Sequence, residues 1–532
     1  MSRSRRLALL VITFLPIVVL IVVSVIHLRH QVDQLARHAN VIIAGELERR
    51  FGKKVLVGNV QAGTLGIAIF KDVRIANGKT LREGTLASAA RVTVTYDWRA
   101  LLLGGNGAQS VSEVVVADPK VLLIRRSDGT FNITELLKPP PGLRRPPFGG
   151  MVRITGGEAT FIDYSVRPGQ LPTPILLHGV AGSIDAAAQP VYRFKGVARG
   201  GGGQFTAARF SGRYYAESER AVVDVDAAGV DTARVADYVW KSNKIQVIGG
   251  NVDTAMGLDI RRKDGRYVIS MAGTARVNNA AVRLSLFRAP ATNVNGTVVV
   301  SGSRAAARLS WTFAGAPMRA TGTVTDFRNP VLDLVIDSSA IEMSRLIAST
   351  TFLGALSQFS PSGRGPVHAR VTGRLSNPVV DATARVPRAS IRNVPVQNVS
   401  ISATYHQGRV DVRSLELLAK RAIVRASGYI TTAPAATLAL GGRFDNLDLG
   451  VLPMKTAFPV TGKASGTFTL TGPSANPRAS VNARVANGTV AKVAFTSVDG
   501  IIEIAGSRVT IKDLNVAGVY KGSVRASGVV TG

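Results

Sequence analysis

The side chains that most often carry enzyme chemistry are few in this sequence, and they do not form a catalytic set. The chain has six histidines and no cysteine, which excludes thiolate metal sites, iron–sulfur clusters and cysteine nucleophiles. It contains neither a G-x-S-x-G nucleophile motif nor an H-E-x-x-H zinc motif. We therefore predict a protein that is not an enzyme, with no catalytic residues, no metal site and no cofactor.

Three local patterns resemble functional sites but have simpler explanations. His27 and His30 lie at helical spacing after an apolar run, and we interpret them as solvated groups at headgroup level. Gly200–Gly203 is not followed by Lys-Ser/Thr, so it is predicted to be a loop that does not bind phosphate. Asp224 and Asp226 share one strand face, and we interpret them as solvated acids.

The strong positive charge indicates the kind of partner to expect. Lys and Arg number 65 against 34 Asp and Glu, which gives a net charge of +31. Such a balance favours nucleic acid, lipid headgroups or other polyanions. The basic residues are scattered, and no basic arm, RNP-like motif or zinc-finger motif occurs. We therefore predict no nucleic-acid partner, and place most arginines on the solvated faces of strands with an added attraction for headgroups.

The N-terminal residues read as a membrane anchor. Residues 7–28, from Leu7 to Leu28, form an apolar run long enough to cross a ~30 Å hydrocarbon core. Basic residues cluster before it, which predicts that residues 1–6 form a cytoplasmic tip and that the rest is translocated. A cleaved signal peptide is the alternative, but its apolar region is shorter and ends at small residues. Residues 29–52 are predicted to form an amphipathic helix.

From residue 53 onward the period of the sequence changes from helix to strand. Segments such as Arg91–Tyr96, Leu309–Phe313 and Ala479–Val485 alternate apolar and polar residues, as half-buried strands do. The pattern predicts a mostly β body of about 30–40 strands, estimated from the spacing of turn signals. Nine period-two apolar residues are predicted to face inward: Val92, Val94, Leu309, Trp311, Phe313, Leu438, Leu440, Val481 and Val485.

Helical patterns are too few and too short to cover the apolar face of so many strands. They occur at residues 96–102, 132–137, 232–240, 343–359 and 449–455. The dry face must therefore pack against another sheet as a sandwich, or curl lengthwise into a trough that something else fills. Periodicity alone leaves both architectures open.

Internal repeats indicate how the body is organised. Residues 372–386 (TGRLSNPVVDATARV) are echoed at 471–485 (TGPSANPRASVNARV), and Arg425-Ala426-Ser427-Gly428 is echoed at 525–528 and, with Thr for Ser, at 319–322. The period is about 100 residues, and stacked repeats predict an elongated body. A Pro-rich linker at 139–150 is predicted to separate a β domain at 53–138 from a repeated sheet at 151–532.

Together these segments resemble the AsmA/TamB superfamily of bacterial envelope proteins. The resemblance rests on the single anchor followed by ELERRFGKKVLVGNVQAGTLGIAIFKDVRIAN, on VSEVVVADPKVLLIRRSDGTFNITELL, and on the recurring Asn-Pro strand module that ends in Arg-Ala-Ser-Gly. The resemblance covers most of the chain, although each motif is degenerate. It implies a curled antiparallel sheet of the kind found in bridge-like lipid transfer proteins, in which the nine inward-facing residues are expected to line a lipid-facing trough.

The resemblance also implies a function. We expect an inner-membrane protein whose N-terminus is cytoplasmic and whose periplasmic body moves or guides phospholipids toward the outer membrane. The alternative is a non-enzymatic scaffold that assembles outer-membrane proteins by β-augmentation. The expected partners are phospholipids, the inner membrane and an outer-membrane barrel protein. TamB-like chains are usually much longer, which leaves docking to a barrel and the choice between AsmA-like and TamB-like open.

Overall fold

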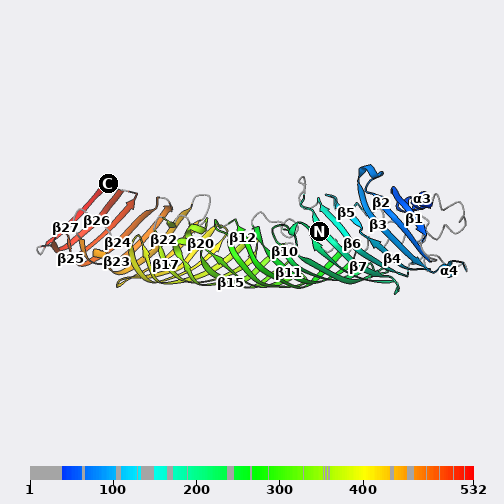
Figure 1. Ribbon diagram of the computed structural model, residues 1–532. Helices are drawn as coiled ribbons and strands as arrows, with labels where there is room; N and C mark the ends of the chain where they lie inside the picture. The colour runs from blue at the N-terminus through cyan, green and yellow to red at the C-terminus, as the bar shows by residue number, and fades with distance from the viewer. Residues whose placement is uncertain are drawn as a thin grey trace. The chain divides into compact units, whose positions relative to one another are not determined.

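A computed structural model shows the architecture of the chain (Figure 1). It describes residues 39–531, apart from 63–65, 103–109, 129, 133–148, 165–171, 189, 236–244, 264–265, 286, 328, 352, 354–355, 358–359, 432–435, 452–459, 475, 491, 507 and 520–521. The predicted cytoplasmic tip (1–6) and membrane anchor (7–28) lie outside this range. No helix within the described range is both long and apolar enough to cross a membrane.

The described part of the chain is almost entirely antiparallel β structure, which confirms the predicted β class. It contains 27 strands, fewer than the 30–40 expected, because individual strands are longer than the spacing of turn signals suggests. β11 and β12, for example, each have 19 residues. Helices are short, as predicted: α4 (Trp98–Leu102), α6 (Met343–Ser349) and η5 (Leu449–Val451) begin within three of the expected segments.

The chain forms two compact units. The first takes its described residues from Met1–Ser242, Val247–Asn278 and Val299–Ser303, and the second from Asn243–Gln246, Asn279–Val298 and Arg304–Gly532. The division passes through β12 (Arg266–Leu284), at Asn279. Asn279 has a left-handed backbone, with φ of 49°.

The first unit is a sheet whose core is covered at one end by a helix. α3 (Ala39–Phe51) packs on the sheet beside β1, and its Ile43 and Leu47 are buried. This helix lies within the predicted amphipathic segment 29–52, of which residues 29–38 are outside the described range. The strands are β1 (Val55–Ala62), β2 (Ile67–Ala76), β3 (Thr85–Tyr96), β4 (Val111–Ala117), β5 (Lys120–Arg125), β6 (Met151–Asp163), β7 (Ile175–Asp185), β8 (Val191–Gly200), β9 (Ala207–Tyr215), β10 (Arg220–Asp231), β11 (Ile245–Lys263) and the first part of β12; short 3₁₀ turns are η2 (Leu81–Glu83) and η3 (Gly201–Gly203).

Strands on the two sides of the predicted linker at 139–150 pair with each other. β4 and β5 both run parallel to β6, in the registers Val114–Val152 and Leu123–Phe161. The segments before and after the linker therefore belong to the same unit. From β6 to β11 the pairing is antiparallel between consecutive strands.

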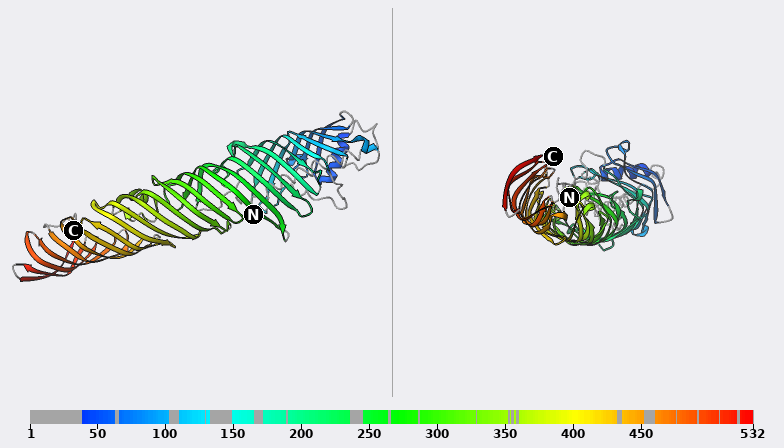
Figure 2. Two further views of the ribbon diagram at one scale, coloured as in Figure 1. Left: turned by 90° about the horizontal axis from the view of Figure 1, so that it is seen from below. Right: turned by 90° about the vertical axis from the view of Figure 1, so that its left-hand side faces the viewer.

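The second unit is a meander in which each strand from β14 onward pairs antiparallel with the next. Its strands bend along their length, which gives the sheet a concave and a convex side (Figure 2). The strands are β13 (Ala291–Ser301, in part), β14 (Arg304–Phe313), β15 (Ala316–Thr325), β16 (Val331–Glu342), β17 (Ser362–Arg374), β18 (Asn377–Ile391), β19 (Val394–His406), β20 (Arg409–Ala419), β21 (Ala422–Thr431), β22 (Thr437–Asp448), β23 (Val460–Pro473), β24 (Arg478–Val490), β25 (Val493–Ala505), β26 (Arg508–Val519) and β27 (Gly522–Thr531).

Candidate functional site

One unbroken row of apolar residues crosses the whole second unit. Directly paired residues in an antiparallel sheet point to the same face, so the registers define which side chains lie together. The row begins at Leu309 and passes through Gly428 and Leu440 to Val530. Its members, one per strand from β14 to β27, are Leu309, Ala320, Ile336, Ala369, Ala382, Ala403, Val412, Gly428, Leu440, Leu470, Ala479, Ile504, Val509 and Val530.

The row one residue further along faces the other side and is polar. It starts at Ser310 and Arg319 and continues through the paired residues Asp337, His368, Thr383 and Ser402. We use "apolar face" for the side of the second unit that carries Leu309, and "polar face" for the side that carries Ser310. Side chains thus alternate between the two faces along each strand, and the sheet has one apolar side and one solvated side.

Seven of the nine residues predicted to face inward lie on this apolar face. Leu309, Trp311 and Phe313 alternate along β14, and Leu438 and Leu440 alternate along β22. On β24, Val481 and Val485 pair with Phe468 and Ala464 of β23, which share the same side. Leu309, Trp311, Leu440, Val481 and Val485 are only half-buried.

The covering on the apolar face is small compared with its extent. The helices within the described part of the second unit are α6, with 7 residues, and η5, with 3. Met343 of α6 packs beside a buried cluster that includes Val386, Val399 and Leu417. Ile504 and Val524 on the same face keep 39% and 52% of their surface exposed. Among the described residues, ten helical residues therefore face fourteen strands and leave part of the apolar face uncovered.

The other two predicted residues, Val92 and Val94, lie in the first unit and are fully buried. Val92 pairs with Phe70 and Val116, and Val94 with Ala68 and Val114. Their exposed fractions are 1% and 0%. The structure thus places them in a filled core, where their side chains serve packing, and does not bring them together with the seven on the second unit.

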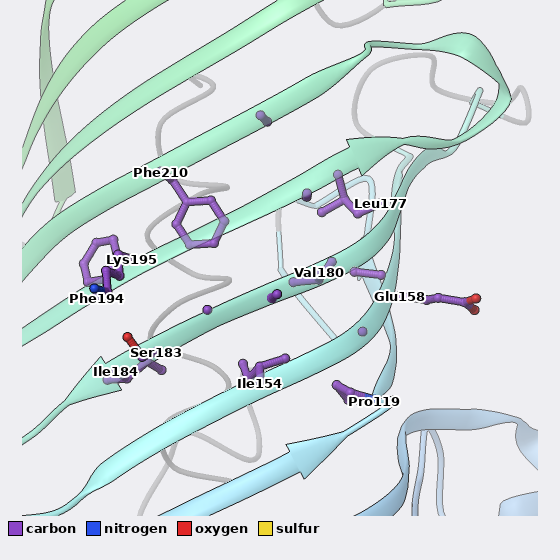
Figure 3. A pocket seen from close by; sticks show the side chains of 16 residues that line it. Pro119, Ile154, Glu158, Leu177, Val180, Ser183, Ile184, Phe194, Lys195 and Phe210 are labelled. Atoms are coloured by element: carbon purple, nitrogen blue, oxygen red, sulfur yellow. The ribbon is translucent and has the colours of Figure 1, made fainter.

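A small apolar cavity lies on the sheet of the first unit (Figure 3). Its volume is about 120 Å³. Ile154, Leu177, Phe194 and Phe210 from β6, β7, β8 and β9 lie around it. Phe210 lies against Gly196 and Phe194 against Gly212, because a Cβ on either glycine would overlap the facing ring.

The same ring-on-glycine arrangement recurs in the second unit. Phe468 lies opposite Gly442, and Phe495 lies opposite Gly488. Rings that cover glycines in this way protect the backbone and pin the register. Sequence periodicity detects the phenylalanines but not their glycine partners, which in the first unit lie 14 and 18 positions away.

The polar face of the second unit is held by cross-strand ion pairs. Arg370 pairs with Asp333 at 3.1 Å, and Arg425 pairs with Glu416 at 2.8 Å. Asp381 accepts hydrogen bonds from the Thr404 hydroxyl and from Arg413, which lowers the pKa of this carboxyl below its usual value. Exposed pairs of this kind contribute at most about 1 kcal/mol each. Each pair is neutral overall and holds its arginine on the solvated side of the sheet.

Two of the three sequence patterns that resemble functional sites, Gly200–Gly203 and the pair Asp224 and Asp226, lie within the described residues. Gly200–Gly203 form a turn, with Arg234 donating to the Gly202 carbonyl oxygen. Asp224 and Asp226 point to the polar side of β10, opposite Ser211 and Arg209. No group of three potential metal-ligating side chains occurs among the described residues. His27 and His30 lie outside the described range.

Asn132, in the segment FNITELL, has a structural role that periodicity does not reveal. Its side chain is buried, donates to the Asn77 side-chain oxygen at 2.7 Å, and accepts from the Ile124 N–H at 2.9 Å. Lys53 donates to the Asn77 carbonyl oxygen at 2.8 Å. The three residues form a hydrogen-bonded cluster that links the start of β1, the end of β2 and β5. Buried polar groups are tolerated because they are hydrogen-bonded.

Comparison with known proteins assigns no family. The chain matches no protein-family model, and no curated protein matches it. The geometry of the apolar face therefore carries the functional argument.

Proposed function

We propose that the second unit binds the acyl chains of phospholipids along its apolar face and guides them as part of outer-membrane biogenesis. The observation that carries the proposal is the unbroken apolar row from Leu309 to Val530, which no described layer covers. An exposed apolar surface of this extent is unfavourable in water and marks a binding surface. Linear acyl chains fit a long row better than a compact ligand does, because every strand supplies an equivalent apolar position.

We further propose that residues 7–28 anchor the chain in the inner membrane with the β body in the periplasm. The length of this apolar run and the basic residues before it support the proposal. A C-terminal alkaline phosphatase fusion should be active and membrane-bound. Activity in the soluble fraction would contradict an uncleaved anchor.

Native mass spectrometry of the full chain extracted in mild detergent tests the lipid proposal. We expect phospholipid to co-purify with the wild-type chain. Leu440→Arg should reduce bound lipid, because burying a charge among acyl chains without a partner costs several kcal/mol. The matched control is Ala439→Arg, whose side chain points to the polar face beside Tyr429 and Thr471.

The alternative function predicts a different result in the same material. A scaffold that pairs with nascent outer-membrane strands would carry no lipid and would crosslink from its strand edges to barrel proteins. An empty wild-type chain, or equal effects of the two arginine variants, would contradict the lipid proposal.

A further inference from the structure

The hairpin turns of the second unit differ in charge between the two edges of the sheet. Alternate turns of a meander lie on the same edge. On one edge, two-residue turns hold Arg392-Asn393 and Lys420-Arg421, and Lys492 closes a third. We call Arg392, Lys420, Arg421 and Lys492 the basic rim. On the other edge, the described residues of three turns, Leu375-Ser376, Gln407-Gly408 and Gly506, carry no charge, and the adjoining Arg374, Arg409 and Arg508 begin or end strands on the polar face.

Basic residues of this rim occupy backbone conformations that other residues adopt more easily. Arg392, Lys420 and Lys492 have φ values of 45°, 56° and 70°. Glycine, asparagine and aspartate are the usual residues at such turn positions. On the neutral edge Gly408 and Gly506 take such positions, with φ of 77° and 61°, and so does the uncharged Gln407, with φ of 46°. Strained positions that persist in a fold cluster at functional sites.

Three of the four rim charges are exposed and available to a ligand. Lys420, Arg421 and Lys492 are all exposed, and they form no ion pair with another described residue. Arg345 of α6 continues the rim, since its guanidinium lies against Gly315 in the turn between β14 and β15. It also pairs with Glu342 at 3.1 Å.

The rim lies directly beside the apolar face. The apolar residues Ile391 and Ala422 adjoin the turns, and Ala422 is completely buried. Successive turns on one edge are two strands apart, which is about 10 Å. This spacing separates the turns of Arg392 and Lys420 and is close to the Debye length of about 8 Å at physiological ionic strength, so these two charges reinforce one another, whereas Lys492 lies four strands beyond Lys420. An amphiphile with an anionic headgroup can therefore contact the basic rim with its headgroup and the apolar face with its acyl chains.

We propose that the basic rim binds the phosphate headgroups of anionic phospholipid monomers whose acyl chains lie on the apolar face. This inference rests on the proposed function and deepens it by naming the headgroup class and the edge that holds it. Headgroups would then be placed along one edge of the second unit only. The neutral edge would carry none.

Removing the rim charges tests this directly in the full chain. The variant Arg392→Gln/Lys420→Gln/Lys492→Gln is compared with Arg374→Gln/Arg478→Gln/Arg508→Gln, which removes three charges from strand ends on the polar face near the neutral edge. Glutamine suits these turns, because Gln407 already has φ of 46°. Each protein is equilibrated with mixed micelles of phosphatidylglycerol and phosphatidylcholine, and bound lipid is counted by native mass spectrometry.

We expect the rim variant to lower the ratio of bound phosphatidylglycerol to phosphatidylcholine by about fivefold or more, the effect of about one basic contact per headgroup. Total bound lipid should change little, and the control variant should stay within about twofold of wild type. Equal ratios in all three proteins, or equal loss in both variants, would overturn the rim proposal while leaving acyl-chain binding intact. A wild-type chain that binds no lipid would overturn the proposed function itself.

Two further measurements distinguish binding of a phospholipid monomer from binding of free phosphate and from docking on a membrane surface. Inorganic phosphate at millimolar concentration should not displace phosphatidylglycerol, and full displacement would mean a simple anion site. Anionic vesicles that bind the protein without losing lipid to it would mean that the rim docks on a membrane surface. Either result would overturn the proposal of a bound monomer.

Discussion

Gly428 of β21 lies directly opposite Leu440 of β22, so closely that a side chain on the glycine would overlap the neighbouring backbone. A Cβ there would lie 2.8 Å from the Leu440 Cα atom and would collide with the Ala439 carbonyl oxygen. Gly322 has the same relationship to Leu334 in the preceding copy of the motif. In these two copies the Arg-Ala-Ser/Thr-Gly motif therefore marks a close approach of two strands on the apolar face.

The close approach predicts that Gly428→Ala destabilises the second unit. Its φ of 139° is rare for residues with a side chain, and the overlap with Ala439 cannot relax without separating the strands. We expect a loss of about 1–3 kcal/mol, measured by urea unfolding and by faster amide exchange in β21 and β22. Gly528→Ala is the matched control from a later copy, since no atom lies within 4 Å of its Cβ position. Equal losses would refute this reading of the motif.

The buried pair Arg125–Asp163 should be far more sensitive than an exposed pair in the same unit. The two charges are 3.3 Å apart, with side chains 4% and 0% exposed. Asp163→Asn leaves Arg125 with an uncompensated buried charge, so the free energy of unfolding should fall by about 3–5 kcal/mol. Glu113→Gln removes an exposed partner of Arg153 and should cost less than about 1 kcal/mol. Similar losses in thermal or urea unfolding would contradict the assignment.

Asp259 should make the stability of the first unit depend on pH in the acid range. Hydrogen bonds from Arg261 and Arg220 lower the pKa of its carboxyl from 3.8 to about 2. Because the folded pKa lies below the unfolded one, the stabilisation is complete above about pH 4 and is lost as the pH falls through about 2. Solvent screening at this partly exposed site limits it to about 1 kcal/mol.

Asp259→Asn is therefore expected to unfold at lower urea concentration than wild type at pH 7. The difference between the two proteins should shrink as the pH is lowered from 4 toward 2. A difference that stays constant over this range would show that the carboxylate charge is not what stabilises the fold.

Lys420→Asn should stabilise the second unit while weakening its interaction with anionic lipid. Asparagine adopts the left-handed backbone of this turn more readily than lysine does, so we expect a gain of about 0.5–1 kcal/mol. Lys463→Asn, placed within β23, provides a control in which asparagine should instead weaken a strand. A destabilised Lys420→Asn would show that the lysine is favoured by the turn itself.

The strand faces could be predicted from the sequence because side-chain direction alternates with period two. Leu309, Leu438 and Val481 fall on the apolar face for this reason. Period two also predicts that Val92 faces inward, but its complete burial in a filled core could not be predicted, because it depends on α3 and on the pairing of β4 and β5 with β6. Such long-range pairing leaves no local signature.

The basic rim also follows from topology and not from local pattern. Arg392, the pair Lys420-Arg421 and Lys492 lie far apart in the sequence. They share an edge only because the strands between them alternate in direction. The sequence shows the repeated glycines as a motif. Why glycine is needed there becomes clear only from the strand register, which places Leu440 opposite Gly428.

Site-specific photo-crosslinking along the apolar row tests the central claim most directly. A photoreactive residue is placed at Ala320, Leu440 or Ile504, and at the adjacent positions Thr321, Ala439 or Glu503, in the full chain expressed in membranes. We predict phospholipid adducts at the first three positions and none at the second three, since the two sets lie on opposite faces. Adducts at both sets, or at neither, would contradict a continuous lipid-binding face.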